Sequence, residues 1–318
     1  MSRVPSGRQF ELVHGSQRAV VVEVGAGLRS YRAGGRDIVD GYRRLEPCEG
    51  GRGQLLVPWP NRIAAGKYSF EGRDLQLPIN DPKTGSAIHG LTRSMSWRLR
   101  DAAPDSCALA LDLHPRDGYP FRLGLEVTHT LDSRGLRVQV SAVNRGDGPC
   151  PYGAGAHPYV HLGDGGLIDG ALLRAPANTT LQTDARGIPT GVALPVDATD
   201  LDFRTPRPVG SLLFDTAFTN LAADDDGITR FLLTAPAGDR GVAVWMDATL
   251  PFAMIYSGDT IADVPRRRRG LAIEPMTCAP DAFNSGAGLI VLQPGEAHTC
   301  TWGITPLTGS DADGLLPR

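Results

Sequence analysis

The chain of 318 residues lacks several patterns that would indicate common classes of protein. No segment approaches the ~18 consecutive apolar residues that a membrane-spanning helix needs, and the first ten residues, MSRVPSGRQF, contain no apolar core of a secretion signal. The five cysteines are odd in number, lie far apart and form no C-x-x-C pair, which argues against a disulfide framework and against a zinc site. We therefore expect a cytoplasmic protein that has no contact with a membrane and binds no metal ion.

The charge pattern excludes further classes. A net charge of -3 provides no field that would attract nucleic acid or an anionic membrane. The acidic run at residues 224–226 lacks the spaced oxygen ligands of a calcium loop and predicts a hairpin turn instead. The segment GAGLRS at residues 25–30 lacks the last glycine of a dinucleotide-binding fingerprint, and no helix follows it. A neutral small molecule suits this chain better than a nucleic acid or a nucleotide.

Helical periodicity is also missing, whereas turn residues are abundant. The 39 glycines and 25 prolines separate short runs rich in Val, Leu and Ile, which predicts many strands joined by turns. Residues 121–131 and 136–144 alternate apolar and polar side chains, which predicts an antiparallel hairpin with one buried face. Since all-β chains of ~200 to 250 residues commonly form one domain, we expect a single domain over residues 1–318. It should be an all-β, large antiparallel β-sandwich with a core from about residue 10 to 305 and flexible ends.

The clearest candidate for chemistry lies in residues 270–286, GLAIEPMTCAPDAFNSG. Residues 271–273 predict the end of a buried strand, and Glu274 follows at the point where Pro275 is expected to stop the ladder. A carboxylate in such a place is either ion-paired or functional. Residues 276–284 mix small and turn residues, so we expect a loop able to fold over a ligand.

Small residues accompany two histidines. His157 follows glycine and alanine in CPYGAGAHPYVHLG, a pattern that favours an imidazole held by close packing and available for acid–base catalysis. His89 stands in AIHG before Gly90, which lets another backbone or a ligand approach closely. A histidine that simply fills the core remains the alternative for both positions, and for His89 it is the commoner case.

Polar side chains with hydrogen-bonding capacity occur in two further segments. Residues 55–66, LLVPWPNRIAAG, hold Trp59 between two prolines, so that its ring either stacks on a sugar or packs in the core. Asn61 and Arg62 follow directly, and an amide and a guanidinium can both hydrogen-bond to hydroxyl groups. Asp215 lies in the apolar segment FDTAFTN, an unusual position for an acid unless something binds it.

Taken together and in this order, the segments resemble the aldose 1-epimerase (galactose mutarotase) family. The matching pieces cover most of residues 20–305 and are PNRI, AIHG, Trp97, DGYP, AHPY, FDTAF and IEP. The resemblance implies a galactose mutarotase-like supersandwich with an open sugar-binding face. It also implies a small-molecule sugar as substrate and neither a metal nor an organic cofactor.

The resemblance also implies roles for individual residues. It assigns Glu274 as the general base on the anomeric hydroxyl and His157 as the general acid on the ring oxygen, with Asn61, Arg62, His89 and Asp215 in sugar binding. Exchange of anomers requires opening of the hemiacetal, which needs one base and one acid. With ordinary pKa values of ~4.3 for glutamate and ~6.5 for histidine, a partner that raises the pKa of the imidazole would help.

Three alternatives remain open at this point. A branch of the superfamily acts on hexose 6-phosphates, and Arg93 in HGLTR matches its HG-x-x-Arg spelling, although the rest of that branch's entry motif is missing. The basic run at residues 266–269 predicts a solvated loop that could also meet a phosphate. A glycoside hydrolase would need two carboxylates ~5 to 9.5 Å apart, and Asp215 is the obvious partner for Glu274. A non-catalytic sugar-binding β-sandwich is the third alternative.

Overall fold

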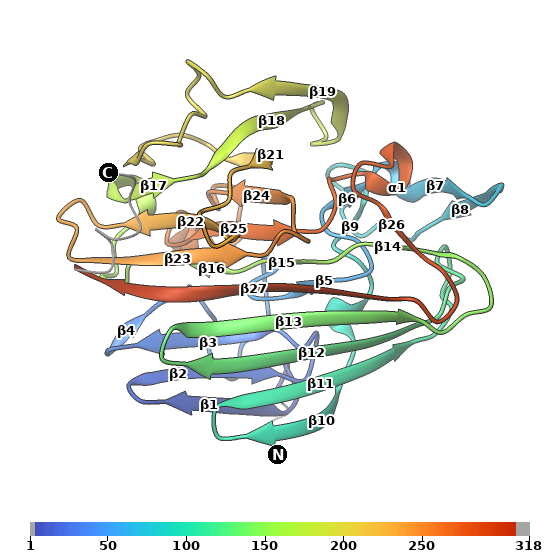
Figure 1. The fold of residues 1–318 in the computed structure, drawn as a ribbon, viewed down its shortest axis with the longest axis horizontal. Coiled ribbons are helices and arrows are strands. Elements are labelled where there is room, and N and C mark those ends of the chain that lie inside the picture. The colour runs from blue at the N-terminus through green and yellow to red at the C-terminus, as the bar shows by residue number, and fades with distance from the viewer. Residues whose placement is uncertain (1–3, 310–318) are drawn as a thin grey trace.

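The structure is a computed structural model that describes residues 4–309. Its long strands form a nine-stranded antiparallel sheet that crosses the view in Figure 1. The strands of this sheet are β10 (Arg98–Ala103), β11 (Ser106–Leu113), β12 (Leu123–Asp132), β13 (Gly135–Asn144), β17 (Leu172–Arg174), β20 (Arg207–Pro208), β22 (Thr229–Thr234), β23 (Arg240–Met246) and β27 (Ala297–Thr308). Their spatial order is β10-β11-β12-β13-β27-β23-β22-β17-β20, so β27 joins β13 to β23.

A second, eight-stranded sheet carries the candidate site. Its strands are β5 (Leu55–Leu56), β15 (Gly155–Ala156), β16 (Tyr159–Val160), β18 (Ala177–Thr183), β19 (Pro189–Pro195), β21 (Asp215–Leu221), β24 (Phe252–Tyr256) and β25 (Leu271–Met276). The order is β19-β18-β21-β24-β25-β15-β5, and β16 also pairs with β25. β25 is therefore an inner strand, with β24 on one side and both β15 and β16 on the other.

The N-terminal part of the chain forms a separate four-stranded sheet. Its strands are β1 (Gln9–His14), β2 (Gln17–Val22), β3 (Leu28–Ala33) and β4 (Arg36–Asp37), in that spatial order. β1 and β2 contact β12 of the nine-stranded sheet. A bridge between Val39 and Val160 links the segment after β4 to the sheet that carries the site.

The remaining elements are short. Three two-strand ladders pair β6 (Arg62–Ile63) with β9 (Ala87–Ile88), β7 (Lys67–Phe70) with β8 (Arg73–Gln76), and β14 (Cys150–Tyr152) with β26 (Ile290–Leu292). The helical pieces are η1 (Ala64–Gly66), η2 (Thr92–Ser94), η3 (Ile168–Gly170), η4 (Val264–Arg266) and α1 (Ala282–Ser285). None of the helices within residues 4–309 is long and apolar enough to span a membrane. The expected all-β class is confirmed, and α1 provides one turn of helix in the segment expected to be a loop.

The predicted hairpin of residues 121–144 is confirmed and shows why alternation is informative. β12 and β13 pair antiparallel along their length, with Val127 opposite Val140 and the chain reversing between Asp132 and Gly135. Leu125, Val127 and Val140 are buried in the main core. The side chains of each strand alternate between buried and partly exposed positions, because a pleated strand points successive side chains to opposite faces.

The expectation for the chain ends is only partly tested, because residues 1–3 and 310–318 lie outside the described residues. Residues 6–9 do not follow it. Gln9 begins β1, Ser6 is buried, and the Ser6 carbonyl accepts a hydrogen bond of 3.1 Å from the Val24 amide. At the other end β27 continues to Thr308, which lies opposite Arg240. Both end segments are held by hydrogen bonds to parts of the chain that are distant in sequence. Their polar composition does not indicate these partners.

The structure also decides between the two interpretations of Trp59. The indole is 2 % exposed and packs edge to face against Phe283, with ring centroids 5.8 Å apart, and against Tyr119 at 6.4 Å. Phe283 in turn contacts Tyr68 at 5.0 Å. Trp59 is therefore a core residue, and the sugar-stacking interpretation is not supported. The aromatic cluster anchors the segment that leads into Asn61 and Arg62.

Replacing Trp59 by alanine is expected to lower the free energy of unfolding by about 3–5 kcal/mol, because the substitution removes a fully packed indole and leaves a cavity. Urea denaturation followed by circular dichroism measures this loss. Trp245→Ala is the matched control, since Trp245 is only partly buried and its removal should cost less. A loss below ~1 kcal/mol in Trp59→Ala would contradict its assignment to the core.

Candidate active site

Glu274 lies inside β25 and not at its end. The strand continues through Pro275, which stands opposite Ala253 of β24, so the expectation that Pro275 stops the ladder is wrong. On the other side of the strand, the amides of Ile273 and Thr277 donate to the Pro158 and Ala154 carbonyls. The N–H that Pro275 lacks would point between these two bonds, where the neighbouring chain interrupts its pairing between β15 and β16. Proline is tolerated because no ladder bond is required at that point.

The pleat of β25 separates Glu274 from the main core. Leu271 and Ile273 belong to the main hydrophobic core, whereas Ala272 and Met276 pack in two small separate clusters on the opposite face. Glu274 has the same parity as Ala272 and Met276, and it therefore lies between these clusters. It is only 2 % exposed, so the carboxyl group occupies a nearly dry position on the side of the sheet that faces away from the core.

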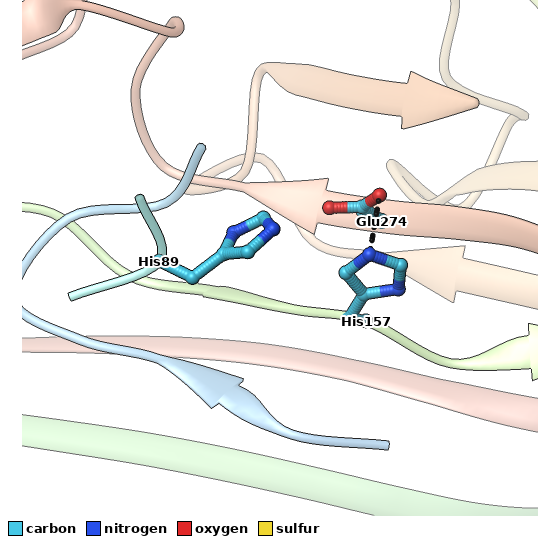
Figure 2. A group of neighbouring side chains, drawn as sticks. All are labelled: His89, His157 and Glu274. Atoms are coloured by element: carbon cyan, nitrogen blue, oxygen red, sulfur yellow. Dashed lines mark ion pairs between the residues drawn. The ribbon is translucent and has the colours of Figure 1, made fainter. Parts of the chain in front are cut away.

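His157 lies next to this carboxyl group. It follows β15 in the short break before β16, and it is 5 % exposed. Its Nε2 is 3.2 Å from Oε1 of Glu274, the contact marked by the dashed line in Figure 2. Oε2 of Glu274 and Nδ1 of His157 have no hydrogen-bond partner among residues 4–309. Oε2 of Glu274 is therefore a hydrogen-bond acceptor that no described protein group uses.

His89 completes a group of three side chains, and Figure 2 shows its ring directed toward the other two. Its ring centroid is 5.3 Å from that of His157, in an edge-to-face arrangement at 76°. The backbone that carries it is held by a 2.9 Å hydrogen bond from the His89 amide to the Asn61 carbonyl. A Cβ on Gly90 would lie 2.1 Å from the Val57 carbonyl oxygen, so the close backbone approach predicted for this glycine is confirmed.

Arg62 and Asp215 form a charged edge to the site. Nη2 of Arg62 is 3.6 Å from Oδ2 of Asp215, and its Nε is 3.4 Å from Oδ2 of Asp81. Asp215 opens β21 and keeps about half of its side chain exposed, at 50 %. The Asn61 side chain is buried, and its Oδ1 accepts a 2.9 Å hydrogen bond from the Arg62 amide, so it fixes a turn at positive φ.

Burial dominates the electrostatics of the acid in the pair. It raises the pKa of Glu274 well above the ordinary value, and the nearby negative charge of Asp215 adds to this shift, while Arg62 opposes it. Burial also raises the pKa of Asp215, again against the effect of Arg62. Both carboxyl groups are therefore easier to protonate than a solvated acid.

The imidazoles shift in the opposite direction. Burial lowers the pKa of His157 to about 3, and the positive charges of Arg52 and Arg93 contribute to the lowering. The pKa of His89 is also lowered by burial, with His157, Arg93 and Arg62 contributing. The net shift of the His157 pKa is downward, opposite to the direction that its expected role as an acid would favour. Without substrate, the His157–Glu274 pair is best described as a neutral imidazole beside a carboxyl group that holds a proton easily.

The same three side chains offer one ligand atom each, and these atoms lie within 4.8 Å of one another. Two ligands on one ion are at most about 4.4 Å apart when the bonds are about 2.0–2.2 Å long. The side chains would therefore have to draw together before a metal ion could bind all three. Direct contact between His157 and Glu274 is already suited to proton transfer.

The sequence-predicted residues thus fall into two groups. Glu274, His157 and His89 come together, and Arg62 and Asp215 pair at their edge. Asp81 was missed, because an acid in the turn-rich segment NDPKTGS resembles any solvated turn residue. Its contact with Arg62 depends on the β6–β9 ladder, which the local pattern does not reveal.

The basic run at residues 266–269 is only partly the solvated loop that its composition suggested, because three of its four arginines have protein partners. Arg268 donates to Asp259 at 2.9 Å and to Asp169 at 3.2 Å. Arg266 lies within 3.7 Å of Asp40, and Arg267 donates to the Ile261 carbonyl at 2.8 Å. These arginines hold loops together, so they are not available as a ready phosphate site.

The class of protein is a large antiparallel β-sandwich that carries a buried contact between Glu274 and His157 on one of its sheets. The family model described as Aldose 1-epimerase matches residues 8–305, and the chain belongs to this family. It is 34 % identical over 300 residues to the uncharacterized protein YihR of Escherichia coli (strain K12), covering 94 % of this chain and 93 % of that protein. It is also 26 % identical over 286 residues to the galactose mutarotase of Rattus norvegicus, covering 83 % of this chain and 80 % of that protein.

Solved structures show the same fold. The GalM/aldose epimerase homologue from C. elegans superimposes with a TM-score of 0.85 at 20 % identity, covering 95 % of this chain and 99 % of that one. Galactose 1-epimerase from Lactobacillus acidophilus NCFM gives a TM-score of 0.78 at 22 % identity, covering 94 % of both chains. The expected galactose mutarotase-like fold is therefore confirmed.

The lowered pKa of His157 gives a prediction that does not depend on any activity. Its imidazole should remain neutral from roughly pH 8 down to pH 5, because both limits lie above a pKa of about 3. Nitrogen-15 NMR of histidine-labelled protein measures the protonation state, and the signal that disappears in His157→Asn identifies the ring. A midpoint near the ordinary histidine value of ~6.5 would show that burial does not control this group.

Proposed function

We propose that the protein is an aldose 1-epimerase that interconverts the α and β anomers of free aldohexoses such as glucose and galactose. The observation that supports this most directly is the contact of 3.2 Å between Nε2 of His157 and Oε1 of Glu274. In this proposal Glu274 is the base, His157 is the acid, and a sugar is bound over the face of the sheet that carries Glu274. Membership of the family supports the same reaction class.

The spacing of the pair fits the chemistry of anomer exchange. The anomeric hydroxyl and the ring oxygen are both bonded to C1, so an acid and a base that serve them must be close neighbours. Oε2 of Glu274 has no partner among the described residues and is the atom available to accept the hydroxyl proton. His157 then donates a proton to the ring oxygen, the C1–O5 bond breaks and the open-chain aldehyde forms.

The mechanism requires the His157–Glu274 pair to hold one titrating proton, and the pKa shifts affect which of the two residues holds it. Ring opening begins with carboxylate and imidazolium and ends with carboxylic acid and neutral imidazole, so the pair holds one titrating proton before and after. Ordinary pKa values favour the charged form, whereas burial raises the pKa of Glu274 and lowers that of His157. These opposite shifts favour the neutral form that results from opening, and closing after rotation about C1–C2 restores the charged form. Because the groups are in contact, they titrate as a pair.

The remaining predicted residues are proposed to hold the sugar. Arg62 and Asp215 present a donor and an acceptor beside each other at the edge of the site. His89 stands beside His157 with an unpartnered Nδ1 among the described residues. Asn61 supports this group from behind, through its hydrogen bond to the Arg62 amide. A binding role for these four residues remains a prediction.

A glycoside hydrolase is less well supported. Such an enzyme uses two carboxyl groups, one of them as a proton donor, at ~5 to 9.5 Å across the scissile bond. Here the closest functional neighbour of Glu274 is an imidazole, and Asp215 is engaged with Arg62. A sugar-binding protein without catalysis would have no need for a nearly dry acid and an imidazole in direct contact, because burial of both groups costs stability.

Removing either member of the pair is expected to lower kcat for mutarotation of α-D-glucose by at least ~10²-fold, the usual scale for loss of a positioned proton-transfer group. The variants are Glu274→Gln and His157→Asn, which keep the shape of the side chains. KM should change little, because neither substitution removes the edge formed by Arg62 and Asp215. Polarimetry of freshly dissolved sugar measures the rates.

Three results from the same assay bear on this assignment. Asp215→Asn is the matched comparison and should act chiefly on KM, because it alters a proposed binding group. Near wild-type kcat in folded Glu274→Gln would end the assignment, since each proton transfer in this mechanism involves that carboxyl group. Treatment with EDTA should leave the rate unchanged, and loss of activity that a divalent ion restores would show that a metal takes part.

A second candidate function rests on Arg93. Its guanidinium makes no hydrogen bond or ion pair with any residue in 4–309, although burial lowers its pKa. It is near enough to lower the pKa of both site histidines. A half-buried guanidinium without a protein partner suits an anionic substituent, which keeps a hexose-6-phosphate 1-epimerase as the alternative.

Comparison of glucose with glucose 6-phosphate separates the two functions. Free glucose should have the higher kcat/KM, because Arg93 is one cation without a partner among residues 4–309, and the arginines at 266–268 are already engaged. Arg93→Gln should then change glucose turnover little. A higher kcat/KM for the 6-phosphate that falls selectively in Arg93→Gln would favour the second candidate.

A further inference from the structure

The loop of residues 49–54 holds the backbone of His157 from both sides. The Gly53 amide donates to the His157 carbonyl at 2.9 Å, and the His157 amide donates to the Gln54 carbonyl at 3.0 Å. Gly51 of the same loop lies against the imidazole, and a Cβ there would be 2.9 Å from Cδ2 of the ring. The loop therefore fixes the backbone that carries the imidazole and covers part of the ring.

A stacked aromatic ring fixes the orientation of the imidazole. The ring of Tyr159 is nearly parallel to that of His157, with centroids 4.9 Å apart and planes at 22°. Nδ1 of His157 has no hydrogen-bond partner among the described residues. Catalytic and metal-binding histidines are usually oriented by a hydrogen bond to the second ring nitrogen. Here packing takes the place of that hydrogen bond.

Tyr159 is itself held by a buried arginine and by the loop. The guanidinium of Arg52 lies over the Tyr159 ring, 5.2 Å from its centroid, and the Tyr159 hydroxyl donates to the Gly50 carbonyl at 2.9 Å. Nε of Arg52 is 3.2 Å from Asp40, and Nη1 donates to the Glu49 carbonyl at 3.0 Å. The chain of contacts runs from Asp40 through Arg52 and Tyr159 to the imidazole.

The burial of Arg52 is difficult to explain by stability alone. Its side chain is 2 % exposed, yet Nη2 has no hydrogen-bond partner among residues 4–309. A buried ion pair seldom stabilises a fold more than apolar groups would, and an unsatisfied buried donor is costly. The contact of the guanidinium with the ring of Tyr159 is attractive but recovers only part of that cost. A role in holding Tyr159 would account for this arrangement.

We propose that Tyr159 and Arg52 are positioning residues that hold the His157 imidazole in contact with Glu274. Tyr159 fixes the plane of the imidazole, and Arg52, held by Asp40, fixes the position of the Tyr159 ring. The inference rests on the proposed function, because it gives these residues a purpose through the acid role of His157. Neither residue needs to touch the sugar for this effect.

The charge of Arg52 gives this arrangement a second readout. The groups that surround His157 are Glu274, His89 and Tyr159, with the positive charges of Arg52 and Arg93 nearby. Burial is the main cause of its lowered pKa, and Arg52 contributes to it. Loss of the Arg52 charge should raise the pKa of His157, whereas loss of a neutral residue that only packs should not.

Two substitutions of Tyr159 test the packing. Tyr159→Phe keeps the stacked ring and loses only the bond to the Gly50 carbonyl, so its kcat should stay within ~3-fold of wild type. Tyr159→Leu removes the stack and should lower kcat by ~10- to 10²-fold with little change in KM, because misplacing a catalytic group by about 1 Å can cost 10²-fold. Tyr31→Leu is the matched control, since Tyr31 is buried and donates a hydrogen bond to the Gln17 side chain within the N-terminal sheet, away from the site.

The control variant should lose stability and keep kcat. Equal losses of kcat in Tyr159→Phe and Tyr159→Leu, or in Tyr31→Leu and Tyr159→Leu, would overturn the proposal. If Tyr159→Leu does not fold, the substitutions of Arg52 decide the question. Thermal unfolding measured by circular dichroism establishes which variants are folded.

Substitutions of Arg52 give a readout that does not require activity. Arg52→Gln removes the charge and should shift the NMR titration midpoint of His157 to higher pH, whereas Arg52→Lys should leave it near that of wild type. An unchanged midpoint in folded Arg52→Gln would overturn the charge effect and the proposal with it. Absence of mutarotation in wild-type protein, together with the expected NMR shifts, would instead show that the proposed function fails although Arg52 acts on the imidazole.

Discussion

Successive side chains of a β-strand must point to opposite faces, and this constraint on β25 determines most of the site. The strand sends Ile273 into the core and therefore sends Glu274 away from it, while keeping the carboxyl group nearly dry. The acid receives its partner where the adjacent chain interrupts its pairing, between β15 and β16. At that interruption the neighbouring chain offers no ladder bond, so Pro275 loses nothing by lacking an N–H. The same gap between β15 and β16 holds His157.

The rest of the site combines this rigid sheet with a less regular support. β21, β24 and β25 place Asp215 and Glu274 on one face of the sheet, because paired residues in adjacent strands share a face. Arg62 belongs to the small β6–β9 ladder and His89 directly follows it, close in sequence to Trp59 of the aromatic cluster. Groups from five distant parts of the sequence thus meet over a single strand, with Arg62 between two carboxylates to limit their repulsion.

Local patterns predicted much of the fold, and together with the family resemblance they pointed to residues that the structure brings together. The alternation in β12 and β13 was sufficient to predict their pairing, and the segments around Glu274, His157 and His89 indicated a shared site that the structure does bring together. Patterns were less informative wherever a distant partner decides the outcome. A proline normally ends a strand, and only the break in the neighbouring chain explains why Pro275 does not.

The same limitation explains the remaining differences. The ion pairs of Arg268, the contact of Asp81 with Arg62 and the buried position of Trp59 all depend on segments far away in the chain. The electrostatic state of the pair belongs to this category as well. Reference pKa values describe solvated side chains, whereas burial shifts Glu274 and His157 in opposite directions. No local pattern reports how much water a folded protein removes from a group.

The position of β27 has a consequence for how the protein is made. This strand lies between β13 and β23 and pairs with both along most of its length, yet it follows every other strand in the sequence. A ribosome synthesises both neighbours well before it reaches residue 297, so the two halves of the nine-stranded sheet must remain with unpaired edges during translation. Folding of this sheet is therefore completed late, and the cell must protect those edges from other nascent chains until then.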